Sequence, residues 1–166
     1  MLEPEDEAAI EKKYPDLLKR IVVEILESES ANEDCTVHKT QLIQKWGGRF
    51  ALDDFGTGYN SEYALLAIQP DIVKIDRSIT NGCDKDISRR MIIKNLVKLA
   101  RTKQVLVLAE GVETEEEMKT VISCGVDLLQ GYYLAHPLFE PRPLDPQIAK
   151  AIRRVAAPGG KAQDGE

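Results

Sequence analysis

Five short apolar runs recur along this chain, and each is followed by a polar turn and then by a segment with helical spacing. The runs are rich in β-branched residues and bounded by turn signals, which is the pattern of buried strands. They cover residues 21–23, 50–52, 72–75, 105–109 and 126–129. Strands that alternate with helices form a parallel sheet with right-handed crossovers, so the sequence predicts an α/β fold.

The segments between the runs carry recognisable helix ends. Thr114 lies three residues before Glu117, a spacing that predicts a capping box at the start of a helix, and Gly125 marks the end of that helix. By the same criteria, helices are predicted over residues 5–12, 35–46, 61–68, 86–102, 114–124 and 145–155.

Polar side chains stand at the carboxyl end of every run. Parallel strands place these ends on one edge of the sheet, where α/β folds bind their ligands. An acid after a strand also commonly caps the next helix, and for Asp76 alone this simpler explanation is equally good. It is poor for five successive strands, because clustered acids repel one another unless they share a cation or a proton. The residues are Glu24, Asp53, Asp54, Asp76, Glu110 and Gln130.

The charge balance limits what the chain binds. Among its 166 residues, 28 Asp and Glu outnumber 22 Lys and Arg, so the basic footprint of a protein that binds nucleic-acid polymers is missing. No apolar run approaches the ~20 residues of a membrane span, and the acidic start resembles no secretory signal, so we expect a cytoplasmic protein without a membrane span. The three cysteines lack paired spacing and are expected to be reduced thiols.

The segment over residues 53–61 is the most specific in the chain. Asp53 and Asp54 are adjacent carboxylates at a strand end, and together they can hold one or two hard divalent cations through oxygen. Gly56 and Gly58 permit the backbone turns of a loop over a ligand. An ordinary turn between strand and helix is the alternative interpretation.

Four further segments accompany the one at residues 53–61. They are Glu-Ile-Leu-Glu-Ser at 24–28, Lys-Ile-Asp at 74–76, Ala-Glu-Gly-Val-Glu-Thr at 109–114 and Gln-Gly-Tyr-Tyr at 130–133. In order and spacing, the five segments resemble the EAL domain family, the phosphodiesterases that cut cyclic-di-GMP to linear pGpG. The resemblance covers about residues 2–143, and Leu26 departs from it because the family usually has Thr there.

This resemblance implies a modified TIM-type barrel with its site at the carboxyl ends of the strands, and two divalent cations, Mg²⁺ or Mn²⁺. Glu24 and Asp53 resemble ligands of the first metal, and Asp54 resembles a ligand of the second. The substrate implied is the small molecule cyclic-di-GMP.

The resemblance also implies catalytic roles. Lys74 resembles the lysine that contacts the nucleophilic water, Glu110 resembles the catalytic glutamate, and Gln130 resembles the glutamine that completes the network of water and metal. Asp76 is expected near the substrate, and Glu27 resembles the glutamate that anchors the loop after Asp53 and Asp54. Glu113 either supports the site from behind or caps the helix that begins at Thr114.

The family's Glu-Ala-Leu motif, an Asn metal ligand and an arginine that holds phosphate have no counterpart in this sequence. Five strands of an eight-stranded barrel are accounted for. We therefore expect an incomplete TIM-type barrel, with residues 1–155 as the C-terminal portion of an EAL domain and residues 156–166 as a disordered tail.

Unpaired sheet edges predict association, either with a second copy of the chain or with an N-terminal fragment. Two functions stay open. One is a cyclic-di-GMP phosphodiesterase domain that is inactive as an isolated chain, and the other is a non-catalytic module that binds a nucleotide or a protein partner.

Overall fold

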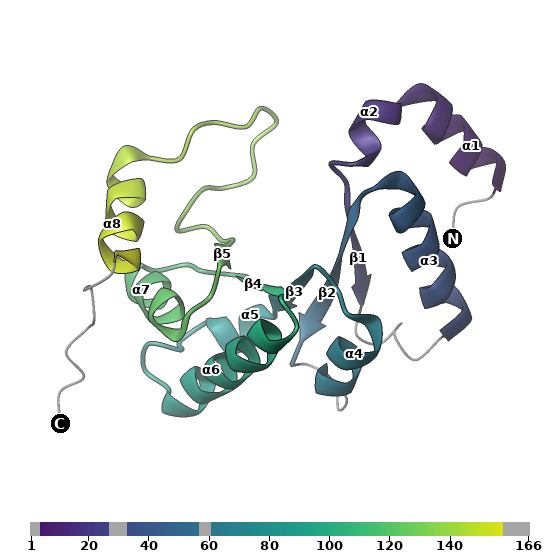
Figure 1. Cartoon of the computed structure of the whole chain (residues 1–166). Helices are drawn as coiled ribbons and strands as arrows, with labels where there is room; N and C mark the ends of the chain where they lie inside the picture. Colours follow the sequence, from purple (N-terminus) through teal and green to yellow (C-terminus); the bar gives the residue numbers. More distant parts are fainter. Residues whose placement is uncertain (1–3, 27–32, 57–60, 158–166) are drawn as a thin grey trace. The chain divides into compact units, whose positions relative to one another are not determined.

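The computed structural model describes residues 4–26, 33–56 and 61–157 (Figure 1). Five strands form one sheet in the order β1-β2-β3-β4-β5, so the strand order follows the chain order. The strands are β1 (Val22–Leu26), β2 (Arg49–Phe55), β3 (Ile72–Ile75), β4 (Leu106–Ala109) and β5 (Leu128–Leu129). The predicted α/β fold, with five parallel strands that alternate with helices, is confirmed.

All six predicted helices are present, and each of their ends lies within two residues of the prediction. Two short helices were not predicted, and both begin at local signals: Pro15 starts one, and Asp76 caps the other. The helices are α1 (Pro4–Lys13), α2 (Pro15–Leu18), α3 (Glu33–Trp46), α4 (Ser61–Ile68), α5 (Arg77–Thr80), α6 (Ile87–Thr102), α7 (Glu115–Cys124) and α8 (Pro146–Ala156).

Two strands run further than the sequence predicted. β1 continues past Glu24 to Leu26, and β2 continues through Asp53 and Asp54 to Phe55. Parallel pairing extends over this part, with Leu26 opposite Asp53. The acids predicted at the ends of these two runs thus lie within the strands, because backbone pairing continues beyond the apolar residues on which the prediction rested.

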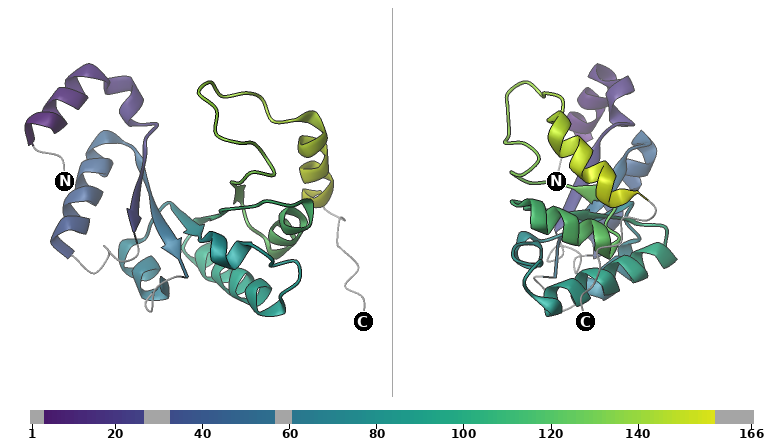
Figure 2. Two further views of the ribbon diagram at one scale, coloured as in Figure 1. Left: turned by 180° about the vertical axis from the view of Figure 1, so that it is seen from behind. Right: turned by 90° about the vertical axis from the view of Figure 1, so that its left-hand side faces the viewer.

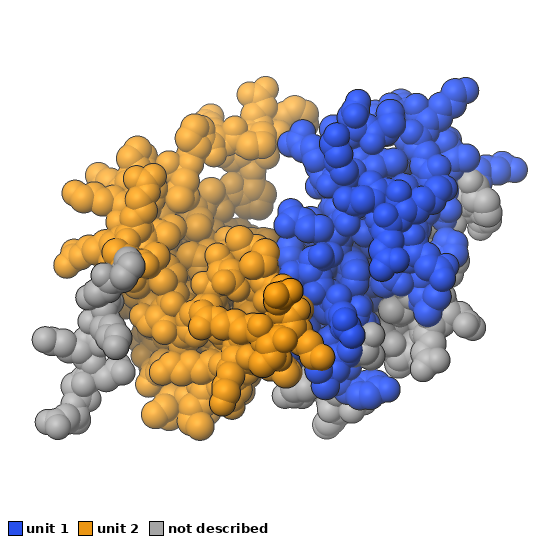
Figure 3. Space-filling model, in the orientation of Figure 1, with its two compact units in different colours: residues 1–73 blue, residues 74–166 orange. Residues whose placement is uncertain are grey.

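The chain divides into two compact units, residues 1–73 and 74–166, and the division falls within β3 (Figure 3). In the first unit, the core joins β1, α3 and β2 through the buried side chains of Ile25, Ile43 and Phe50. Val23 and Ile68 pack against this cluster. Helix α3 and the β1–β2 pair are thus held together by apolar contacts.

In the second unit, α6 and α7 lie side by side, and α8 packs against α7 (Figure 2). Each of these two helices has a buried face, and Ile93 of α6 and Met118 of α7 are fully buried there. Cys83 and Cys124 are buried as free thiols, as expected for those two cysteines. Burial, reinforced by the negative charge of Glu117, raises the pKa of Cys83 to about 12.

An aspartate in front of a strand fixes the register in each unit. The backbone N–H of Phe50 donates to Asp71 Oδ2 at 3.0 Å, and the N–H of Asp71 donates back to the Phe50 carbonyl at 3.1 Å. Asp127 does the same for Val107 in the second unit, with both distances at 2.9 Å. These reciprocal pairs hold the start of one strand against its neighbour.

Most of the predicted C-terminal tail, residues 158–166, lies outside the described residues, while Ala156 ends α8. Across the described ranges, no helix combines the length and the apolar character needed to cross a bilayer.

A buried carboxylate fastens two loops of the second unit. Glu117, only 3% exposed, accepts the N–H of Gly82 on Oε1 at 2.8 Å. Its Oε2 accepts the N–H groups of Glu113 and Thr114 at 2.9 and 3.1 Å, and Thr114 completes the predicted capping box. Burial alone raises the pKa of Glu117, but these backbone donors outweigh it and hold the pKa below the ordinary value of 4.5.

We expect Glu117→Gln to lower the free energy of unfolding at neutral pH by about 1–3 kcal/mol, because an amide offers one accepting oxygen where the carboxylate uses two. The lowered pKa means that the contribution of Glu117 is complete above its ordinary value of 4.5 and is lost as pH falls through the folded-state pKa below it. The difference between the two proteins should therefore shrink in acid. Urea unfolding at a series of pH values measures it.

The matched control is Glu116→Gln, which alters an exposed acid one position away on α7. It should change stability by no more than about 0.5 kcal/mol. Equal stability of Glu117→Gln and the parent chain at neutral pH would contradict the role given to this carboxylate.

Candidate active site

Two opposite charges meet at the carboxyl ends of β3 and β4. Lys74 Nζ lies 2.8 Å from Glu110 Oε1, and the two side chains are only 7% and 19% exposed. The N–H of Glu110 donates to the carbonyl of Ile75 at 3.2 Å, which ties the residue after β4 to β3. In such a poorly hydrated position, removing one charge of the pair is costly for the other.

A hollow of about 230 Å³ opens beside Glu110. Gln130 borders it and is held by its backbone, because its N–H donates to Ala109 at 2.9 Å and its carbonyl accepts the N–H of Val112 at 3.0 Å. The segments that follow β4 and β5 are therefore bonded to each other around the hollow. Its lining is Arg77, Glu110, Gly111, Glu113, Gln130, Gly131, Tyr132, Ala135 and Pro137.

Close backbone approach shapes two sides of this hollow. A Cβ atom on Gly131 would lie 2.2 Å from the carbonyl oxygen of Val112, so no side chain fits there. A Cβ atom on Gly111, whose φ is +65°, would lie 2.6 Å from the Cβ of Arg77. Both glycines allow the loops to pack directly on their neighbours.

Six of the nine lining residues were given no role by the sequence reasoning: Arg77, Gly111, Gly131, Tyr132, Ala135 and Pro137. Arg77 directly follows the Lys-Ile-Asp segment and brings a positive charge to the hollow, and only its position next to that motif signalled it. Tyr132 and Pro137 come from the segment after β5. The Tyr132 ring stacks on His136, with 4.4 Å between ring centroids.

Asp76 has the simpler of its two predicted roles. Its side chain caps α5 by accepting the N–H of Ser78 at 2.9 Å. Partial burial raises the pKa of Asp76, but hydrogen bonds from Ser78 and Arg77 outweigh burial and lower it overall. A position near the substrate stays a prediction.

In the first unit, strand register relates the predicted metal ligands. Glu24 lies opposite Ala51, and Asp53 follows Ala51 by two residues on β2. Because side chains alternate along a strand, Glu24 and Asp53 point to the same face of the β1–β2 pair, as diagonal neighbours.

Asp54 interrupts this alternation. Its φ is +58°, in the left-handed region, and its N–H donates to Asp53 Oδ1 at 3.0 Å. This local bond accompanies the left-handed backbone conformation at Asp54, which short polar side chains tolerate better than most.

Within residues 4–26, 33–56 and 61–157, no group of three or more His, Cys, Asp or Glu side chains is arranged to hold a metal ion. Glu24, Asp53 and Asp54 are hard oxygen donors of the kind that Mg²⁺ and Mn²⁺ prefer, so they fit as part of a ligand set. Glu27 and residues 57–60 of the loop lie outside the described residues.

The structure thus groups the predicted site residues within each unit. In the second unit, Glu110, Glu113 and Gln130 share one hollow, and Lys74 reaches it through its ion pair with Glu110. In the first unit, Glu24 and Asp53 share one face of paired strands.

Comparison with known proteins gives one consistent result. The sequence model of the EAL domain matches residues 5–137. The cyclic di-GMP phosphodiesterase PdeF of Escherichia coli is 36% identical over 126 residues, which are 75% of this chain and 17% of PdeF. This chain therefore spans less than a fifth of that relative.

Comparison with solved structures agrees with the sequence comparison. A standalone EAL protein from Vibrio cholerae, in its c-di-GMP bound form, is 31% identical with a TM-score of 0.71, over 86% of this chain and 61% of that one. The manganese and cy-diGMP complex of Klebsiella pneumoniae BlrP1 is 26% identical with a TM-score of 0.74, over 81% of this chain and 36% of that one. Matching sequence segments and matching fold lead to one conclusion: this chain belongs to the EAL domain family.

Proposed function

We propose that this chain supplies the catalytic half of a cyclic-di-GMP phosphodiesterase site, which hydrolyses cyclic-di-GMP to pGpG. The observation that carries the proposal is the poorly hydrated pair of Lys74 and Glu110, which borders a hollow shared with Gln130. The function named for PdeF and the ligands named for the Vibrio and Klebsiella structures support this choice.

Hydrolysis of a phosphodiester adds water to phosphorus and breaks one P–O bond, so negative charge grows on the phosphoryl oxygens. In this proposal Glu110 accepts a proton from the attacking water, a role supported by its carboxylate at the border of the hollow. The Lys74 ammonium, nearly removed from solvent, stabilises the growing negative charge more strongly than it would in water. The Gln130 amide orients the water.

Glu24, Asp53 and Asp54 would hold divalent cations, Mg²⁺ or Mn²⁺, with further oxygens supplied by other groups. Such cations, when bound, activate water and neutralise phosphate charge. The three carboxylates of this chain orient and retain them.

We infer that residues 1–155 act as the C-terminal portion of the domain, because the sequence contains no Glu-Ala-Leu tripeptide. The isolated chain then has little activity and associates through its sheet. Among the described strands, β1 and β5 end the strand order, and Val22 and Leu26 of β1 are 37% and 40% exposed. Such edges pair with a second copy or with an N-terminal fragment.

Metal binding tests the ligand role proposed for the carboxylates of the first unit. The isolated chain should bind Mg²⁺ or Mn²⁺ weakly, and Asp53→Asn should weaken binding several-fold further, because an amide replaces a charged oxygen. Titration calorimetry measures both proteins. Glu140→Gln, at an exposed position, should leave binding unchanged. Tight binding that Asp53→Asn does not alter would contradict the assignment.

Hydrolysis tests the catalytic role proposed for Glu110 in the second unit. Conversion of cyclic-di-GMP to pGpG by the isolated chain should be slow, and it should rise when a separate polypeptide with the Glu-Ala-Leu portion of an EAL domain is added. Glu110→Gln should reduce the restored rate by about 10²-fold or more. Chromatography of the product measures the rate, and light scattering in the same buffer measures the assembly.

Gln130→Ala provides a second variant, because Gln130 is exposed and its backbone bonds remain. It should lower the rate while the circular dichroism stays that of the parent. A restored rate that neither variant changes would overturn the proposed site. Binding of cyclic-di-GMP without hydrolysis, even with the added portion, would favour the non-catalytic module. A monodisperse isolated chain that hydrolyses rapidly would overturn the fragment inference alone.

A further inference from the structure

An aromatic pair stands at the rim of the hollow beside Glu110. The Tyr132 ring stacks on the His136 ring, with 4.4 Å between the centroids and an angle of 26° between the planes. Tyr132 borders the hollow, whereas His136 is not among the residues that line it. The contact of His136 with the proposed site therefore runs through Tyr132.

Backbone hydrogen bonds hold the segment that carries both rings. The Gly131 carbonyl accepts the N–H groups of the residues three and four positions later, at 3.1 and 3.3 Å, and so closes a turn. The N–H of Tyr133 donates to the carbonyl of Val112 at 3.0 Å and anchors that turn. The turn brings His136, four residues after Tyr132, onto the tyrosine ring.

The Tyr132 side chain depends on this stack for its orientation. The residue is 59% exposed, and exposed side chains change rotamer freely. Within the described ranges, His136 provides the one aromatic contact of the ring. The stack covers one face, and the part of the ring that it leaves open borders the hollow. A ring held in this way forms a flat apolar shelf beside a polar site.

Cyclic-di-GMP carries the group that such a shelf accepts. Its guanine bases are planar, and stacking on an aromatic side chain is a main source of affinity for bases. The residues proposed for the chemistry, Lys74, Glu110 and Gln130, act on the phosphodiester and the water. The base therefore needs a contact of another kind.

We propose that His136 is a positioning residue, which holds the Tyr132 ring in the orientation in which a guanine base of the substrate stacks on it. This inference rests on the proposed function, because cyclic-di-GMP supplies the base. A shelf formed before the substrate arrives reduces the ordering cost of binding. In this arrangement His136 contacts neither phosphodiester nor water, so it affects substrate binding and not the chemical step.

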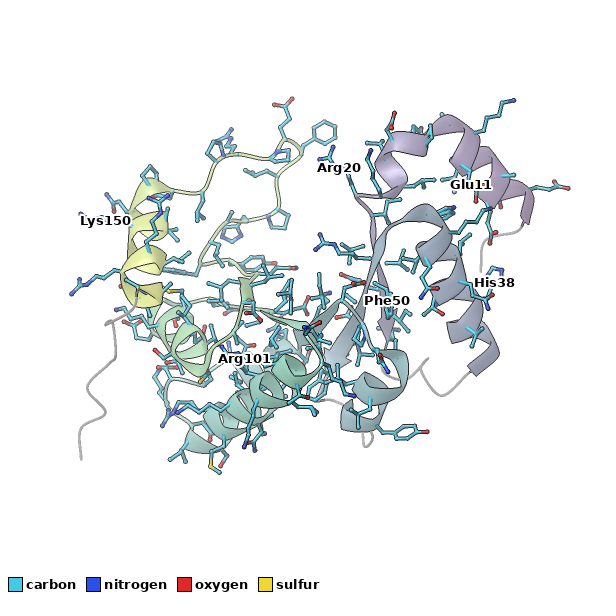
Figure 4. The ribbon with its side chains drawn as sticks, viewed as in Figure 1. Glu11, Arg20, His38, Phe50, Arg101 and Lys150 are labelled. Atoms are coloured by element: carbon cyan, nitrogen blue, oxygen red, sulfur yellow. The ribbon has the colours of Figure 1, made fainter. Side chains whose placement is uncertain are left out.

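Steady-state kinetics of this chain with the added Glu-Ala-Leu polypeptide test the inference. His136→Ala should raise KM for cyclic-di-GMP about three- to tenfold and leave kcat unchanged, because the stack is the same before and in the transition state. His136→Phe keeps a ring at this position and should restore the parent KM. The matched control, His38→Ala, removes the other histidine of the sequence, on α3 in the first unit (Figure 4), and should change neither constant.

Two further measurements separate positioning from a general structural role. In chains that carry Tyr132→Leu, His136→Ala should have no further effect on KM, because the ring on which His136 acts is gone. Equilibrium binding of cyclic-di-GMP is measured in the Glu110→Gln background, so that the ligand is not consumed. After His136→Ala, GMP should compete about three- to tenfold less well. Ribose 5-phosphate, which lacks the base, should compete equally well with and without the change.

The outcomes distinguish this inference from the proposed function. An unchanged KM in His136→Ala, in an assembly whose hydrolysis Glu110→Gln largely abolishes, would overturn the inference alone. An equal loss of competition by GMP and ribose 5-phosphate would do the same. Base-dependent binding that weakens in His136→Ala, without hydrolysis by the parent assembly, would support the inference and overturn the phosphodiesterase assignment. An assembly that does not bind cyclic-di-GMP would overturn both.

Discussion

The ion pair between Lys74 and Glu110 is the interaction on which the second unit depends. The Lys74 side chain is nearly out of water, so its ammonium requires close partners, and Glu110 supplies a carboxylate at 2.8 Å. That requirement fixes the ends of β3 and β4 relative to each other. The N–H of Glu110 donates to the carbonyl of Ile75, which holds the end of β4 against β3. The reciprocal hydrogen bonds between Asp127 and Val107 align β5 with β4.

Behind the ion pair, Glu117 gives the loops around the hollow their shape. Its carboxylate holds the N–H groups of Glu113 and Thr114 on one side and that of Gly82 on the other. The polar face of the hollow is thus supported by a buried anion that does not border it. The proposed chemistry of Glu110 and the stability of the loops therefore depend on separate carboxylates.

Sequence reasoning predicted the elements whose ends carry their own signals. Helix α4 spans residues 61–68 as predicted, and α7 begins after Thr114 and ends before Gly125 as the capping box and glycine require. It mislocated the ends of β1 and β2, because pairing between Leu26 and Asp53 uses the backbone and does not depend on apolar side chains. Strand ends that carry acids are for this reason harder to predict than helix caps.

For the candidate site too, local motifs predicted some residues, whereas others depend on packing that the local sequence does not encode. Glu110, Glu113 and Gln130 were predicted from their motifs, and the structure places them around one hollow. Arg77 and Tyr132 were missed, since their presence there depends on how closely Gly111 and Gly131 let neighbouring backbones approach. Local sequence identifies which residues carry chemistry, while the packing of loops decides which neighbours join them.

The buried thiols of the second unit have a practical consequence. A Cys83 side chain without solvent exposure and with a pKa near 12 stays protonated at neutral pH, and a protonated, inaccessible sulfur does not react with alkylating reagents. Cys124, 7% exposed, is similarly shielded. Alkylation of either sulfur must therefore wait for the surrounding structure to open, so its rate, read by mass spectrometry, reports how often this half of the chain opens in solution.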